Sequence, residues 1–331
     1  MPEQKSENYG EKPLNKFKLR LAISIIAGLG IFIGLAIYAD LREVAQNFAE
    51  FRWTYIPLIV ALTLLNYLLR FYKWDFYLRN IGIKLKSRDS LTIFLSGLTM
   101  SVTPAKIGEV FKSYLLKRLN GTEVSRSVPV VFAERITDVL GLLILAAISF
   151  SAFQYGKEVL IVVLALLLVL IVIIKSRRIC GRLIKITESV PLLNKLSDSL
   201  RMAYESAHSL FGLKNLTVAT AISVISWGFE CLAMYFVLEG FRINVSLLFS
   251  TFVFSFSSLV GAVSMIPGGL VIAEGSFAGL LILAGIPKGI AASATMIIRA
   301  CTLWFGVIVG LIIFLATRKI YFKTSEVLEG N

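Results

Sequence analysis

Charged residues inside otherwise apolar runs are the side chains of this sequence best placed to do chemistry. The run 128–150 contains Glu134, Arg135 and Asp138. On a helix, Glu134 and Asp138 lie one turn apart and Arg135 reaches toward Asp138, so the run presents a charged patch. Within a membrane each such charge costs about 2.5–3.5 kcal/mol, which pairing or a bound ligand must offset. Arg70, near the end of its own run, is expected to reach the membrane surface instead.

The same types of residue recur in one order in two parts of the chain. A proline is followed by a glutamate, by an arginine inside the next apolar run, and by a glycine. These residues are Pro104, Glu109, Arg135 and Gly141 in the first part, and Pro267, Glu274, Arg299 and Gly306 in the second. We interpret the order as an internal repeat. Since opposite charges compensate one another, we predict that the two glutamates and two arginines converge on one buried polar cavity.

Metal, disulfide and triad chemistry find little support in the sequence. The cysteines Cys180, Cys231 and Cys301 are far apart, and His208 is the only histidine. A zinc site or a Ser-His-Asp triad is therefore not expected. The acidic residues of the apolar runs are scattered, without the clustered aspartates that a metal-dependent transferase would need. We expect no metal and no cofactor.

The composition points to a membrane. Hydrophobic residues make up 56% of the 331 residues and charged residues 17%, whereas a soluble domain carries ~25% charged residues. The mean hydropathy is +0.78, so water-soluble enzyme folds are excluded. The net charge of +13 does not indicate nucleic acid binding, because the basic residues lie between the apolar runs, as Lys73 does after the run 54–72.

The apolar runs predict an all-α polytopic membrane protein with about six full spans. They lie at 21–39, 54–72, 128–150, 159–174, 216–238 and 291–316. Basic residues crowd into both termini and the connector 175–215, which the positive-inside rule places in the cytoplasm. We therefore expect a cytoplasmic tail at 1–20, a single domain in the cell membrane at 21–316, and a cytoplasmic tail at 317–331. The connector is expected to be solvated.

Two stretches fit re-entrant helical hairpins better than full spans. Residues 91–103 are too few to cross a bilayer and run into Pro104, after which the chain resumes as a helical pattern at 106–118. Residues 247–286 repeat this plan around the break at 267–269. From the count of spans, the first hairpin enters from the cytoplasm and the second from outside.

Hairpins that enter from opposite faces would relate the two halves, 54–150 and 216–316, by an axis in the membrane plane. This inverted repeat is the plan of many secondary transporters. Half-helices that begin after the two breaks direct free N–H groups and partial positive charge at mid-depth, which suits a phosphate. The candidate substrate-binding residues are Lys106, Glu109, Glu134, Arg135, Asp138, Pro267, Gly268, Gly269, Glu274 and Arg299.

Two alternatives stay open for these residues. The charges can pair with one another only to hold the bundle together, because buried ion pairs are often architectural. The glycines can serve close helix packing alone.

Four runs carry a resemblance to a known family. They are TPAKIGE at 103–109, AERITD at 133–138, IPGGLVIAEG at 266–275 and IRACTLW at 298–304. In order and spacing they resemble the flippase-like membrane domain, which is the transmembrane region of lysylphosphatidylglycerol synthases and also occurs as stand-alone proteins. The resemblance covers nearly the whole chain and implies movement of a lipid or lipid-linked head group between leaflets. Lys106 departs from the small or Gly-rich turn of many members.

Full-length synthases of this family carry a soluble aminoacyl-transfer domain after the membrane part. Residues 317–331 are too few for it, so we expect that the chain is not an enzyme. The favoured function is a flippase or transporter for a lipid or lipid-linked anionic head group. An ion-coupled small-solute transporter shares the layout; a membrane-embedded transferase, or an accessory subunit of a lipid-modifying enzyme, is less favoured. The expected partners are a membrane lipid and, in the accessory case, such an enzyme, but no nucleic acid.

Overall fold

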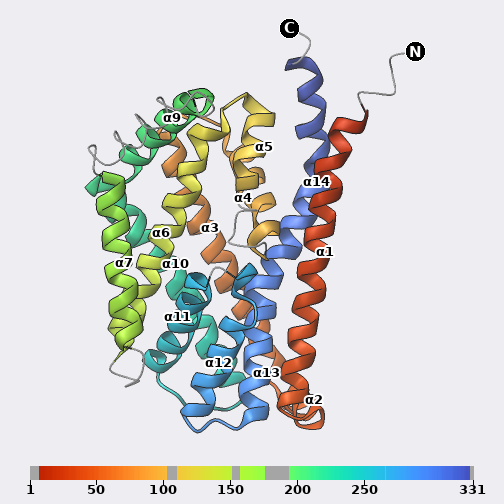
Figure 1. The fold of residues 1–331 in the computed structure, drawn as a ribbon. Coiled ribbons are helices and arrows are strands. Elements are labelled where there is room, and N and C mark those ends of the chain that lie inside the picture. Colours follow the sequence, from red (N-terminus) through yellow and green to blue (C-terminus); the bar gives the residue numbers. More distant parts are fainter. Residues whose placement is uncertain (1–6, 103–109, 151–156, 176–193, 265, 329–331) are drawn as a thin grey trace.

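Helices make up every regular element that the computed structural model describes, in residues 7–102, 110–150, 157–175, 194–264 and 266–328 (Figure 1). Large apolar side chains cover much of the outside. On α7 (Lys157–Lys175), for example, Leu166 and Val172 are 60% and 64% exposed. Soluble proteins seldom expose large contiguous patches of this kind, whereas lipid solvates them. The fold is that of a helical membrane protein.

Three helices of the described ranges are long and apolar enough to cross a membrane. They are Trp53–Asn80, Leu213–Gly240 and Lys288–Arg318. A fourth crossing is present if the pair Ala22–Tyr38 and Leu41–Glu50 (α2), bent by 99°, counts as one broken span. The helix α6 (Val124–Ser149) has a similar length but carries the charged patch. Six full spans therefore remain a prediction.

The helices define two ends of the bundle. The start of α1 (Glu7–Tyr38), the end of α14 (Phe305–Leu328) and all of α9 (Asn194–Leu210) lie at one end, here named the terminal end (Figure 1). The helix α3 (Ile56–Asn80) runs from the opposite end toward the terminal end, and α10 (Leu213–Gly240) runs the other way. The start of α1, the end of α14 and the C-terminal part of the basic connector thus share one side, as the charge distribution predicts.

The first predicted hairpin is described on both sides of its break. The helix α4 (Ser87–Leu98) enters the bundle from the terminal end and tightens into the 3₁₀ turn η2 (Thr99–Val102). The helix α5 (Phe111–Asn120) runs back to the same end (Figure 1). The break itself, with Pro104, lies in 103–109, outside the described residues.

The second hairpin opens toward the opposite end. The helix α11 (Leu247–Val263) enters, the chain breaks at η5 (Pro267–Gly269), and α12 (Ile272–Leu283) returns (Figure 1). Gly268 has a φ of 60°, a conformation that favours glycine. A Cβ atom there would lie 3.3 Å from Cγ1 of Val102. The ends of the two hairpins therefore meet inside the bundle.

The helix α1 packs beside this meeting point. The Ser24 hydroxyl donates to the carbonyl of Val102 (2.9 Å). Gly28 lies against the ring of Trp304, where no Cβ atom would fit. Trp304 ends the π turn η6 (Ala300–Trp304), which joins α13 (Lys288–Arg299) to α14. One long helix thus contacts the first hairpin and the last crossing.

The ends of α3 and α10 have the same local geometry. After α3, the N–H of Ile83 donates to the carbonyl of Leu78 (2.9 Å); after α10, the N–H of Ile243 donates to that of Leu238 (3.0 Å). The residue before each donor has a positive φ, 75° at position 82 and 60° at position 242. In both places the next helix begins four positions after the donor. Equivalent residues are 160 positions apart.

Equivalent features continue after the hairpins at a spacing of 164 positions. Gly121 follows α5 with a φ of 74°, and Gly285 follows α12 with a φ of 85°. Three residues later, α6 and α13 begin. The π turn η6 inserts one residue, and the spacing from Gly141 to Gly306 is then 165. A Cβ atom on Gly141 would press on α10 at Ser223, and one on Gly306 would press on α3.

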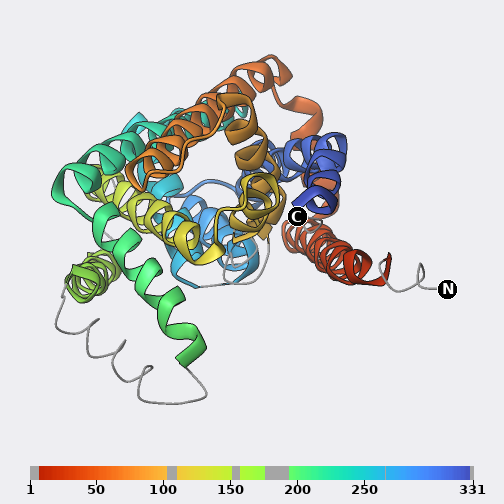
Figure 2. The same cartoon turned by 90° about the horizontal axis from the view of Figure 1, so that it is seen from above.

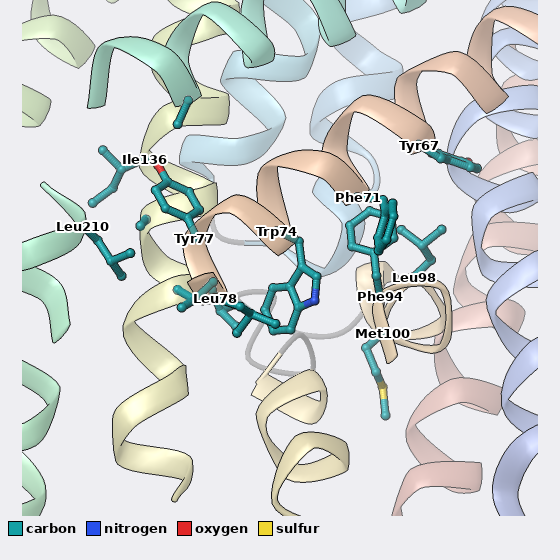
Figure 3. Packing of buried hydrophobic residues seen from close by; sticks show 14 of the residues in the cluster. Tyr67, Phe71, Trp74, Tyr77, Leu78, Phe94, Leu98, Met100, Ile136 and Leu210 are labelled. Atoms are coloured by element: carbon teal, nitrogen blue, oxygen red, sulfur yellow. The ribbon is translucent and has the colours of Figure 1, made fainter. Parts of the chain in front are cut away.

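Buried aromatic residues pack the first half. Trp74 and Tyr77 of α3 are 0% and 1% exposed, and Phe94 of α4 packs with Phe71 at a ring-centroid distance of 6.0 Å (Figure 3). Seen along the bundle, α3, α6 and α10 lie on one side and α1 on the other (Figure 2). These three helices carry most of the buried charges.

Candidate functional site

Asp138 on α6 is the centre of a buried group of charges. It is 2% exposed. Its Oδ1 atom lies 2.5 Å from Nζ of Lys73 and accepts a bond from Nε1 of Trp227 (3.1 Å). Its Oδ2 atom lies 3.4 Å from Arg135 and 3.9 Å from Arg70. We name Arg70, Lys73, Arg135 and Asp138 the Asp138 cluster, in which three cations surround one carboxylate.

A neighbouring ion pair attaches the first hairpin to α6. Nζ of Lys112 on α5 lies 2.5 Å from Oε2 of Glu134, and both side chains are buried. The ammonium group also lies 4.3 Å from the centroid of the Trp74 ring, a cation–π distance. Gly97 on α4 makes room for the Lys112 stem, since any Cβ there would overlap it. The hairpin is therefore fixed to α6 by charge as well as by packing.

A matching ion pair attaches the second hairpin to α13. Nε of Arg299 lies 2.6 Å from Oε1 of Glu274 on α12, and a second guanidinium nitrogen donates to the carbonyl of Gly268 (2.8 Å). Glu274 is 1% exposed, and its Oε2 atom has no hydrogen-bond partner in the described part of the chain. Arg299 thus holds both a return helix and the backbone of the break.

Polar residues form a seam between α3 and α10. Thr63 donates to Glu230 (3.2 Å), and the Asn66 amide donates to the carbonyl of Ser226 (2.8 Å). The Tyr67 hydroxyl donates to the carbonyl of Thr302 in η6 (2.5 Å). These positions on α3 follow the spacing of one helix face that continues to Arg70 and Lys73. The seam therefore runs into the Asp138 cluster.

An apolar cavity of about 500 Å³ lies between α1 and the break of the second hairpin. Its lining is apolar except for one serine hydroxyl. The lining residues are Ile23, Ser24, Ala27, Gly30, Ile31, Ile266, Pro267, Leu270 and Val271. Pro267 directly precedes the glycine whose carbonyl Arg299 holds. Polar and apolar surfaces therefore meet at this break.

The structure gathers the predicted site residues into two groups. Glu134, Arg135 and Asp138 share one group, and Glu274, Arg299, Gly268 and Gly269 share the other, with Pro267 at the cavity. Lys106 and Glu109 lie outside the described residues. Convergence of both glutamates and both arginines on one cavity remains a prediction.

The expectation for Arg70 and Lys73 is wrong. Arg70 is 8% exposed and lies over the ring of Trp227 (5.4 Å), instead of at the membrane surface. Lys73, expected to flank its span, is 0% exposed. The helix α3 continues to Asn80, so Lys73 lies inside the helix and not at its end. The sequence did contain a signal, because the polar residues of α3 are spaced along one helix face. Hydropathy alone ends the apolar run at position 72 and so hides that this face continues. Lys112 was missed because it follows the break among other basic residues.

Comparison with known proteins identifies the group to which the chain belongs. The family model described as "Lysylphosphatidylglycerol synthase TM region" matches residues 25–310. This chain belongs to that family. Within the described ranges, we find no group of three or more His, Cys, Asp or Glu side chains arranged to hold a metal ion.

Several archaeal proteins that are named as membrane proteins are similar to this chain. A UPF0104 membrane protein of Methanothermobacter thermautotrophicus is 28% identical over 88% of this chain and 90% of its own length. One of Methanocaldococcus jannaschii is 29% identical over 68% of this chain and 97% of its own. One of Pyrococcus horikoshii is 24% identical over 91% and 98%. The family thus includes stand-alone forms of the membrane region, and this chain resembles them.

Proposed function

We propose that this protein moves an anionic lipid, or a lipid-linked anionic head group, between the two leaflets of the cell membrane. The observation that carries the proposal is the pair of hairpins, which open toward opposite ends, meet at Val102 and Gly268, and are each held by a buried ion pair. Broken helices that meet at mid-depth provide a polar path where hydrocarbon would otherwise exclude a head group.

The two halves form an inverted repeat in this proposal. Its support is the equivalent helix ends at spacings of 160 and 164 positions, found on α3 and α10, which run in opposite directions. The reciprocal glycine contacts agree with it, since Gly141 of one half presses on α10 and Gly306 of the other presses on α3. A two-fold axis in the membrane plane gives a transporter two alternative arrangements of similar energy.

The head group meets the Asp138 cluster in this mechanism. Three cations share one carboxylate there, so the cluster has positive charge available for an anion. Arginine binds phosphate through two parallel hydrogen bonds. The tails remain in hydrocarbon, and the apolar cavity beside Pro267 offers them a surface next to the polar interior. A soluble polar solute would gain nothing from contact with this apolar lining, whereas acyl chains would.

The experiment is leaflet exchange of a fluorescent phospholipid in vesicles with and without the reconstituted protein. We expect faster exchange with the protein. A Gly30→Trp change should fill the cavity and slow exchange by about tenfold. Gly34→Trp is the matched control, because both glycines are exposed on α1 with open space around them and only Gly30 lines the cavity. Equal rates with and without native protein would overturn the proposal; uptake of soluble phosphate instead would favour the solute transporter.

The orientation in the membrane is tested by single cysteines at positions 154 and 244. The positive-inside rule places both outside the cell, and both termini in the cytoplasm. An impermeant thiol reagent should label both positions in intact cells. Protection of both until the cells are lysed would reverse the proposed orientation.

A further inference from the structure

One buried carboxylate stands apart from the ion pairs. Glu230 on α10 is 2% exposed and accepts a hydrogen bond from Thr63 (3.2 Å). In the described part of the chain it takes part in no ion pair, whereas Glu134, Asp138 and Glu274 each have a cation within 2.6 Å. A carboxyl group without a contacting cation is buried most cheaply in its neutral form. Glu230 is therefore suited to carry a proton.

The cation that acts on Glu230 electrostatically is Arg70, which is loosely held. Its guanidinium group lies 3.9 Å from Oδ2 of Asp138, and its Nε atom has no hydrogen-bond partner in the described residues. It interacts electrostatically with Glu230 without forming an ion pair. Arg70 thus interacts with two carboxyl groups: Asp138, which is also paired with Lys73, and Glu230, which forms no ion pair in the described residues.

The remaining titratable groups around Glu230 are few. On α3 it faces Tyr67, on its own helix Cys231, and on η6 Cys301. The packed helix α11 has no titratable side chain, because its polar residues are serines and one threonine. On α13 the charge of Arg299 is held by Glu274, and on α6 that of Glu134 is held by Lys112. Arg70 is consequently the charge that responds most directly to Glu230.

The surroundings of Glu230 differ in the two directions along the bundle. Toward the terminal end the seam continues through Asn66 and Arg70. Toward the opposite end the helices α3 and α10 bury apolar side chains without polar atoms, including Ile59, Met234 and Val237, each 0% exposed. A proton therefore has a polar route from the terminal end and an apolar barrier on the other side.

We propose that Glu230 binds and releases one proton in each transport cycle, and that Arg70 converts this step into a change of the Asp138 cluster. The inference rests on the proposed function. On release, the O–H bond breaks, its electron pair stays on the carboxylate, and water at the terminal end accepts the proton. The negative Glu230 then draws Arg70 away from Asp138. Binding of the proton lets Arg70 return.

The first experiment measures the proton directly. Infrared difference spectra of the purified protein, titrated from about pH 5 to about pH 9, should contain a carboxylic acid band that Glu230→Gln removes. Glutamine keeps an oxygen that can accept from Thr63, so this variant should fold. Glu239→Gln, a change in the last turn of the same helix, is the matched control and should keep the band. A spectrum unchanged by Glu230→Gln would overturn the inference.

The second experiment measures coupling in vesicles. A pH difference imposed across the membrane should change the native exchange rate about fivefold, should leave Glu230→Gln unaffected, and should affect Glu239→Gln as it affects the native protein. Native exchange that ignores pH would refute the coupling while the proposed function stands. No exchange at all, with a titrating Glu230 band, would refute the proposed function and with it the coupling.

Discussion

The two hairpins are held by ion pairs that join corresponding helices but have opposite polarity. In the first half the return helix supplies the cation, Lys112, and the next helix supplies the anion, Glu134. In the second half the return helix supplies Glu274 and the next helix supplies Arg299. A similar backbone plan thus tolerates exchanged charges, which indicates that these pairs share an anchoring role.

The halves differ in what lies beyond the anchor. The first half adds the Asp138 cluster, whereas the second half adds a bond from Arg299 to the backbone of Gly268. Excess positive charge therefore lies in the first half. In the second half, the buried cation instead fixes the backbone at the break. Under the proposed function, the first half would bind the anionic head group and the second half would shape the break beside its path.

Asp138→Asn should have the largest effect of any single change. It would leave Lys73, which is fully buried, without its carboxylate, and loss of one partner of a buried pair costs about 3–5 kcal/mol. The midpoint temperature of thermal unfolding in detergent should fall accordingly. The double variant Lys73→Met, Asp138→Asn should recover much of the loss because no lysine charge remains there. If the single variant unfolds like the native protein, Asp138 is not the structural centre of the first half.

Arg299→Lys should separate anchoring from shaping in the second half. Lysine can keep the charge opposite Glu274 but cannot also reach the carbonyl of Gly268 in the fork geometry of arginine. We expect a loss of about 1.5–3 kcal/mol, the usual value for one hydrogen bond to a charged group. Leaflet exchange should fall by more than the fraction of folded protein does. Equal falls would mean that Arg299 serves stability alone.

The sequence predicted the elements better than their contacts. The hairpins followed from short apolar runs and prolines, because length and helix breaking are local properties. The patch at Glu134, Arg135 and Asp138 followed from helical spacing. The partners Lys73 and Lys112 did not, since hydropathy treats a lysine near the end of an apolar run as a boundary and carries no information about which helix it faces.

Gly268→Ala should have a smaller effect. The residue has a positive φ and a Cβ there would lie close to Val102, so alanine should cost about 1–2 kcal/mol. Gly275→Ala is the matched control, because that glycine lies inside α12 with open space around it. The control should be neutral or slightly more stable in the same unfolding assay. A loss equal in both variants would argue against a strained break.

Arg79→Gln should have the smallest effect and thereby measures what burial adds to an ion pair. The guanidinium group of Arg79 lies 2.7 Å from Oδ2 of Asp75, almost as close as the buried pairs, but its side chain is 66% exposed. Water screens such a pair and competes for both groups, so its loss should cost about 0.5 kcal/mol or less. Asp75 keeps the hydrogen bond that it accepts from Ser90 (3.1 Å), which leaves no buried charge without a partner there. Unfolding curves of Arg79→Gln and Asp138→Asn in the same detergent give the comparison directly. A loss at Arg79 as large as that at Asp138 would show that distance, and not burial, decides the strength of ion pairs in this protein.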